Sequence, residues 1–198
     1  MSDWLPKDYS EPTNSNYMKF ADGENIFRIL SKPIMGYEYW KTVGDTRKPI
    51  RKRFDENIEV SELEADPRTG KPEVPKVFWA MVVYNHELQK IQILEITQAT
   101  IRRYIADMDN SKLSGDPTGY DISVTRSGEG KETRYTMQRG DKEPIDKKIV
   151  EEYKAMNINL DALFDGEDPF AGSLVETTEG PKDEKKVYKE VFGGDEEQ

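Results

Sequence analysis

The chain has 198 residues, of which 35% are hydrophobic and 34% are charged. It contains no cysteine and a single histidine, which excludes disulfides, thiolate chemistry and multi-histidine metal sites. No apolar run is long enough to cross a bilayer, and the N-terminal MSDWLPKDYS lacks the basic and apolar regions of a secretion signal. We therefore expect a cytoplasmic protein with no membrane association, no metal and no other cofactor.

The net charge of −10 is concentrated at the C-terminal end of the chain. Residues 165–198 hold eleven acidic residues and four lysines, a net of −7, whereas residues 1–164 hold 28 acidic and 25 basic residues, a net of −3. The body is thus nearly neutral. A basic surface on it would be hidden in the overall charge.

Residues 1–24 are polar and predict an N-terminal arm. Extended segments follow at 25–33, 34–43 and 48–54, because they are rich in β-branched and aromatic residues. The acidic, proline-containing stretch 55–75 is predicted to be an insertion. KVFWAMVVYN (76–85) is the strongest strand signal, and IQILEI (91–96) completes an antiparallel hairpin with it.

A helix is predicted after Thr97, where apolar residues recur at helical spacing up to Met108. Period-two patterns at 120–126 and 132–138 predict a second hairpin, and a short helix follows within 142–156. The folded part is expected to close with NLDALF (159–164), ahead of a disordered acidic tail over 165–198.

Short antiparallel strands with one embedded helix favour a mainly β fold with short helices. We predict an OB-fold-type small antiparallel barrel over residues 25–164, with the insertion at about 55–75. A split α+β sheet is the alternative.

Six basic residues lie within positions 41–53, next to aromatic residues. A single nucleic-acid strand is held without sequence reading by cations that bind phosphates and by exposed rings on which bases stack. The segment therefore predicts a nucleic-acid-binding surface made of Tyr37, Tyr39, Trp40, Lys41, Lys48, Arg51, Lys52, Arg53 and Phe54. In the competing interpretation the rings fill the core and the cations form a solvated face. Neighbouring residues of a strand point to opposite faces, so not all of these rings can be buried.

Further residues could extend this surface. Arg28 lies in the first extended segment, and Trp79 lies in the strongest one, where packing in the core is the more common role for such a ring. SGEGKET (127–133) departs from a phosphate-binding P-loop at its first glycine and at its last Ser/Thr position, so we interpret it as a hairpin turn. Arg126, Lys131 and Arg134 could add cations around that turn.

No pair of carboxylates has a spacing diagnostic of catalysis, and a lone histidine, His86, argues against a Ser-His triad. We therefore predict no enzymatic activity. The acidic tail carries apolar side chains as well, and we predict that Phe170, Tyr188 and Phe192 bind partner proteins. The tail could also compete with nucleic acid for a basic groove, or act only as a solubility device.

Over residues 24–164 the sequence resembles the single-stranded DNA-binding proteins of tailed bacteriophages. The resemblance rests on ENIFRILSKP (24–33), on KVFWAMVVYN and IQILEITQATIRRYI (76–105 with five residues between), on SGDPTGYDISVTRSGEGKETRYTM (114–137) and on NLDALF before an acidic tail. It implies an OB-fold core that coats and protects single-stranded DNA in phage replication, recombination and repair, in the host cell cytoplasm. It also implies a tail that recruits replication or recombination proteins. One branch of that family holds zinc through His and Cys, and the lack of cysteine means that no zinc is expected here.

Two other functions compete with this hypothesis. An acidic DNA mimic that inhibits a DNA-binding protein would need a structured acidic face, whereas most of the charge lies in the tail. A metal-dependent nuclease would need a carboxylate spacing that the sequence lacks. We expect single-stranded DNA as the ligand and a monomer or a weak homo-oligomer as the assembly.

Overall fold

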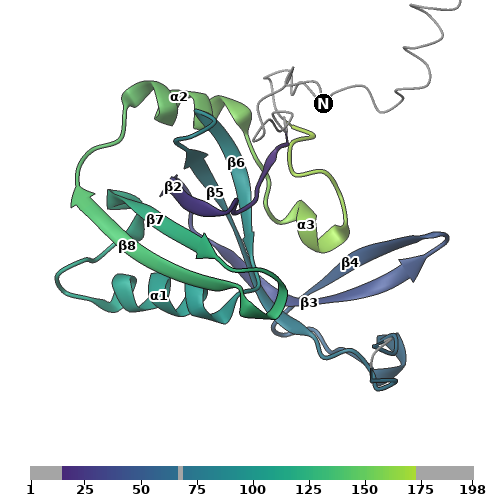
Figure 1. Ribbon diagram of the computed structural model, residues 1–198. Helices are drawn as coiled ribbons and strands as arrows, with labels where there is room; N and C mark the ends of the chain where they lie inside the picture. Colours follow the sequence, from purple (N-terminus) through teal and green to yellow (C-terminus); the bar gives the residue numbers. More distant parts are fainter. Residues whose placement is uncertain (1–14, 67–68, 173–198) are drawn as a thin grey trace, which may run out of the picture.

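Within residues 15–66 and 69–172, which the computed structural model describes, eight strands form one mixed sheet with three short α-helices (Figure 1). The strands are β1 (Tyr17–Met18), β2 (Gly23–Ile29), β3 (Ile34–Val43), β4 (Thr46–Arg53), β5 (Lys76–Asn85), β6 (Lys90–Ile96), β7 (Tyr120–Ser127) and β8 (Arg134–Lys142). The α-helices are α1 (Ala99–Asn110), α2 (Lys147–Met156) and α3 (Ala162–Asp165), with 3-10 turns η1 (Val60–Glu62), η2 (Pro117–Gly119) and η3 (Gly130–Glu132). The predicted mainly β fold with short helices is confirmed.

The strands pair in the order β1-β6-β5-β2-β7-β8, and β3 pairs with both β4 and β5. Every pairing is antiparallel except the one between β1 and β6. Over the described part of the chain this path is open, ending in β1 on one side and in β8 on the other, so the predicted OB-fold-type barrel is not confirmed. β1 takes the outer edge of β6, and α1 contacts both β6 and β8.

Most strand boundaries follow the sequence pattern. β5 coincides with the predicted run 76–85, and β6 and β7 each differ from the prediction by one residue. The N-cap of α1 is Gln98, not the predicted Thr97. α2 begins only at Lys147, because β8 continues to Lys142 and the Asp146 carboxylate caps the helix by accepting a hydrogen bond of 2.9 Å from the Lys148 N–H.

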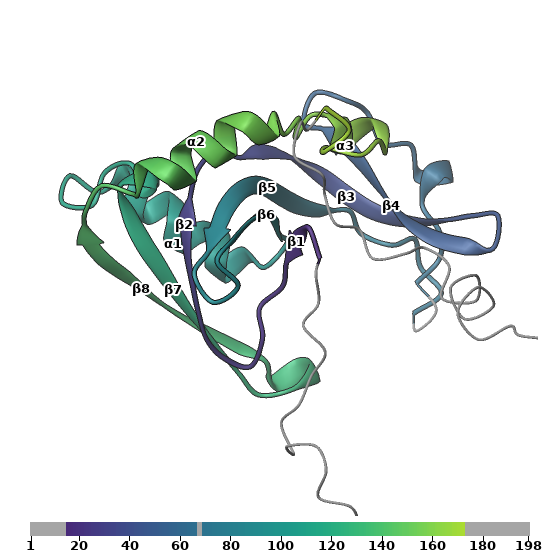
Figure 2. The same cartoon turned by 90° about the horizontal axis from the view of Figure 1, so that it is seen from above.

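Strand β5 is buried on both faces, which explains its continuous apolar sequence. On one face Met81 and Val83 pack with α1 and β7 in a first core. On the other face Phe78, Ala80 and Val82 pack with α2, α3 and the segment that follows α3, in a second core. Figure 2 shows α2 and α3 along one side of β5 and β6 and the β7–β8 hairpin on the other side of these two strands.

The folded part of the chain extends beyond its predicted end at Phe164. Phe170 is only 4% exposed and belongs to the second core. The Asn159 N–H donates to the Pro169 carbonyl over 2.9 Å, and the Asp168 carboxylate accepts from the Phe170 N–H over 3.0 Å, a turn that returns the ring to the sheet. This burial disfavours the predicted role of Phe170 as a partner contact in a free tail, and that role stays a prediction.

Strands β3 and β4 form a hairpin that projects from the rest of the sheet, and we call it the arm (Figures 1 and 2). The two-residue turn Gly44-Asp45 joins its strands, with Gly44 in the left-handed region at φ 63°. At the base of the arm, a Cβ placed on Gly36 would clash with the Lys52 carbonyl oxygen and would lie 2.9 Å from Cε1 of Phe164. Glycine at this position therefore allows the close approach of the β4 backbone and of the Phe164 ring to β3.

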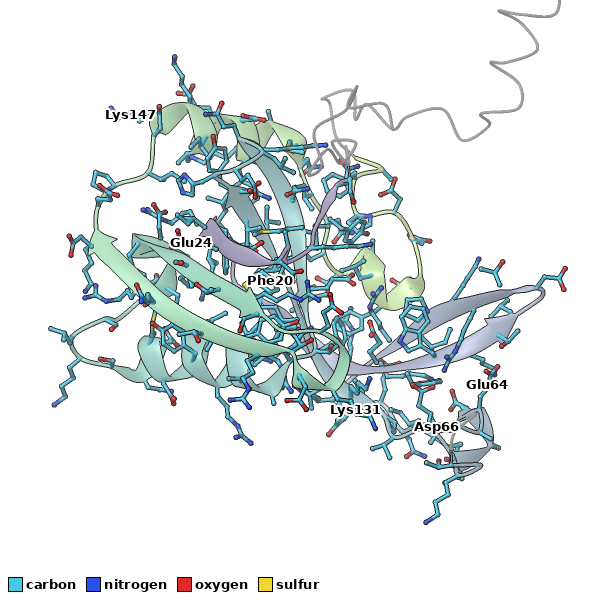
Figure 3. All side chains as sticks on the ribbon, viewed as in Figure 1. Phe20, Glu24, Glu64, Asp66, Lys131 and Lys147 are labelled. Carbon is cyan, nitrogen blue, oxygen red and sulfur yellow. The ribbon has the colours of Figure 1, made fainter. Side chains whose placement is uncertain are left out.

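The predicted insertion runs beside the arm. The Tyr39 hydroxyl donates a 2.7 Å hydrogen bond to the Glu62 carboxylate, and the Glu64 carboxylate accepts from the N–H and the hydroxyl of Thr42. Figure 3 shows Glu64 next to the arm and Asp66 further along the insertion. The insertion is thus attached to the arm through its own carboxylates.

Candidate nucleic-acid interface

The two faces of the arm carry different cations, because the strand register alternates side chains between them. One face, which we call the lysine face, carries Tyr37, Tyr39 and Lys41 on β3 opposite Lys52, Ile50 and Lys48 on β4. The other, the arginine face, carries Glu38 and Trp40 on β3 with Arg53, Arg51 and Arg47 on β4. The arginine face lies on the side of the sheet that α3 covers, since the Arg53 guanidinium sits 4.2 Å from the Phe164 ring centroid.

Arg51 is a largely buried residue that two carboxylates hold in place. Its side chain is 9% exposed; Nε lies 3.1 Å from Oε2 of Glu38, and Nη2 lies 2.9 Å from Oε2 of Glu95. The guanidinium also lies 5.4 Å from the Phe78 ring centroid in the second core. An arginine held between two carboxylates cannot also bind phosphate without breaking this cluster, so the geometry disfavours the predicted role of Arg51 in nucleic-acid binding, which stays a prediction.

Burial also governs the protonation of Glu95. Removal from water raises the pKa of its carboxyl, and the nearby Glu38 charge raises it further, whereas Arg51 lowers it. Its Oε1 atom is buried without a hydrogen-bond partner. The cluster at the base of the arm therefore contains two carboxylates and one arginine, and one oxygen of Glu95 is left without a hydrogen bond.

Arg47 and Arg53 remain accessible, with 47% of each side chain exposed. Nη2 of Arg47 lies 2.7 Å from Oε2 of Glu73, and Nη1 of Arg53 lies 2.8 Å from Oδ1 of Asp161. Exposed ion pairs of this kind contribute little to stability and exchange readily with other anions. The guanidinium groups of Arg47 and Arg53 could therefore release their carboxylate partners and bind phosphate instead.

Lys41 and Lys48 stand directly opposite each other on the lysine face, and both are exposed. In the described part of the chain neither has an ion-pair partner within 4 Å. Like charges placed opposite each other across two strands are unfavourable. An anion held between these lysines would relieve that repulsion. Lys52, nearer the base, is 3.6 Å from the Glu62 carboxylate.

The aromatic residues of the arm divide into a buried one and accessible ones. Tyr39 is 1% exposed, and burial together with the hydrogen bond to Glu62 raises the pKa of its hydroxyl to about 12. This burial disfavours the predicted role of Tyr39 as a stacking platform, which stays a prediction. Trp40 is 36% exposed with the Arg47 guanidinium 5.9 Å from its ring centroid, and Phe54 is 50% exposed, edge-on to Tyr37.

Two residues predicted from the strands lie elsewhere. Arg28 is 3% exposed, with its Nε 2.6 Å from Oδ1 of Asp121 and its Nη1 donating to the Glu143 carbonyl over 3.0 Å. This burial disfavours its predicted nucleic-acid contact, which stays a prediction. Trp79 packs against the first core and lines a cavity beside α1. It is half-buried there, on the side of the sheet away from α3.

The turn between β7 and β8 has the predicted hairpin form, with η3 at its tip. Arg126 is paired with Asp22. Lys131 and Arg134 are exposed, and Figure 3 shows Lys131 at the tip of this hairpin. Tyr188 and Phe192 lie outside the described residues.

Sequence reasoning missed the carboxylates that neutralise the basic run. Glu38 was visible as an acid within an aromatic strand, a pattern that suits a buried partner for a cation. Glu95 and Asp161 are distant in sequence, and only the fold brings them to Arg51 and Arg53.

Comparison of the chain with protein-family models, with curated proteins and with solved structures finds no match. No helix in the described ranges is long and apolar enough to cross a membrane. Among the same residues no group of three or more His, Asp or Glu side chains could hold a metal ion.

Proposed function

We propose that this protein binds single-stranded DNA without sequence preference, through the outer part of the arm. The observation that carries the proposal is a cluster in three consecutive cross-strand pairs. It combines the exposed ring of Trp40 with three exposed cations, Lys41, Lys48 and Arg47. Rings and cations interleaved in this way serve stacking and phosphate binding without reading base edges.

The position of the cluster supports the proposal. It lies at the end of a hairpin that projects from the sheet, where a flexible strand can reach both faces (Figure 1). The outer face of β5 and β6 is covered by α2 and α3, whereas the arm and the β7–β8 tip carry exposed basic residues.

The strand connectivity supports an OB-type origin for the core. The five strands β6-β5-β2-β7-β8 are neighbours in that order, and α1 joins β6 to β7 in the chain. A partly open five-stranded Greek-key barrel has this arrangement, and it binds oligonucleotides with the loops that flank its strands. The arm and the β7–β8 turn correspond to two such loops. A role in coating and protecting DNA during replication and recombination follows from this proposal.

The test is the binding of dye-labelled oligo-dT, followed by fluorescence anisotropy at several salt concentrations. Two variants of equal charge are compared, K41Q/K48Q on the arm and K147Q/K148Q on the exposed side of α2, far from the arm (Figure 3). If both arm lysines bind phosphate, K41Q/K48Q should reduce the log–log salt slope by about 1.4, at roughly 0.7 per contact on a single strand.

The α2 variant should leave the slope unchanged, and oligo-dC should follow oligo-dT in every protein. Equal losses in the two variants would show that only net charge matters and would refute the arm as the interface.

A further inference from the structure

A cavity of about 540 Å³ lies beside α1, at the bend between β2 and β3. Its interior is apolar, formed by Ile29, Pro33, Met35, Trp79, Met81 and Ile105. It opens to solvent at Met35, whose side chain is 43% exposed. This volume lies in the range of pockets that hold small ligands or large side chains.

The charged groups that line the cavity are Lys32, Asp109 and Asp116, a net of −1. Hydrogen bonds from the N–H and hydroxyl of Thr118 lower the pKa of Asp116, so this carboxylate is charged at neutral pH. The net negative charge around the cavity repels phosphate. The cavity therefore suits an apolar or aromatic side chain flanked by cations, and it is a poor site for a nucleotide.

The chain itself contains one segment of that chemistry outside the described residues. All four lysines of residues 173–198 fall within 182–189, and residues 185–192 read KKVYKEVF. This octapeptide has three lysines and one glutamate, a net of +2, and four apolar residues that include Tyr188 and Phe192. It is a basic, apolar block within an otherwise acidic tail.

The described residues end at Gly172, close enough to the cavity for residues 185–192 to reach it. Phe164 of α3 approaches Gly36 on one face of β3, and the neighbouring Met35 lines the cavity on the opposite face. Sixteen residue steps separate Gly172 from Tyr188. They span about 53 Å when fully extended and about 22 Å on average as a flexible chain, enough to pass around a strand.

We propose that residues 185–192 bind in this cavity of the same chain, with an aromatic side chain inside and lysines next to Asp109 and Asp116. Tethering supplies a high effective concentration, so a weak contact suffices. The proposal does not depend on nucleic-acid binding, because the cavity and the arm cluster share no residue.

The absence of cysteine allows a direct test in the full chain. The variant E190C carries a single nitroxide label, and methionine methyl groups are observed by NMR with the label active or reduced. The expected result is loss of the Met35 and Met81 signals. The loss should be smaller at Met156, because that residue lies in the second core on the other face of the sheet and the broadening falls steeply with distance.

The reverse-charge variant D109K should restore the Met35 and Met81 signals. Its matched control D107K, an exposed aspartate two residues away on α1, should not. Full Met35 and Met81 signals in E190C, or equal effects of D109K and D107K, would overturn the proposal. Signal loss seen only when labelled and observed chains are mixed would assign the contact to a second copy and would overturn the intramolecular form. Oligo-dT binding to the arm is measured separately and would be unaffected by any of these outcomes.

Discussion

Replacing Arg51 with alanine separates a structural role from a role in DNA binding. The substitution leaves Glu38 and Glu95 at the base of the arm without their shared cation. Removing one partner of a buried ion pair costs about 3–5 kcal/mol, because the remaining charge stays desolvated. Both side chains of the Arg51–Glu38 pair are 9% exposed, so solvent screening reduces this figure little.

The expected loss is measurable by thermal and urea unfolding. For a chain of this size each kcal/mol shifts the melting temperature by about 2–4 °C, so R51A should melt about 6–20 °C below the parent protein. R53A is the matched control on the same face of the same strand, and its exposed pair with Asp161 should give a much smaller shift.

The pH dependence gives a second readout. Glu95 has a raised pKa in the folded protein, so between its unfolded and folded pKa values the folded state binds more protons. Stability is therefore lost as pH rises through that window. In R51A the Glu95 pKa is no longer lowered by Arg51, so stability should fall more steeply with rising pH. Adding E95Q to R51A should remove much of this pH dependence of stability. Unchanged stability of R51A together with weaker oligo-dT binding would refute the structural role.

The remaining predictions concern the arm. Trp40→Ala should weaken oligo-dT binding, measured by anisotropy, by about 1–3 kcal/mol with little change in melting temperature. Tyr39→Ala should instead destabilise the fold by about 3–5 kcal/mol, because that ring is buried. The opposite pattern in the two variants would exchange the roles of the two rings. Gly36→Ala should cost about 1–3 kcal/mol or more in urea unfolding, because the new methyl group overlaps the β4 backbone. Wild-type stability would show that the β4 backbone does not approach Gly36 this closely. Glu73→Gln should release Arg47 from its ion pair and tighten oligo-dT binding at low salt. Glu87→Gln removes the same charge from an exposed position and is the control. Equal tightening in the two variants would show that only the net charge matters.

The sequence alone determined where most strands lie. The run that forms β5 is dense in β-branched and aromatic residues, and this local preference holds wherever the strand is placed. The turn between β7 and β8 was likewise readable, because its glycines separate two period-two patterns. The helix starts were less accurate, since α2 depends on how far β8 extends before it.

The tertiary structure alone decided which side chains of the arm are accessible. Period-two alternation places Tyr39 and Trp40 on opposite faces, but it carries no information about which face the insertion covers. Arg51 and Arg53 share one face and look equivalent in sequence. The Arg51 side chain pairs with Glu95 of β6 and is 9% exposed, whereas the Arg53 side chain is 47% exposed. Burial is set by contacts between elements far apart in the chain. A local pattern therefore predicts a strand well and a binding surface poorly.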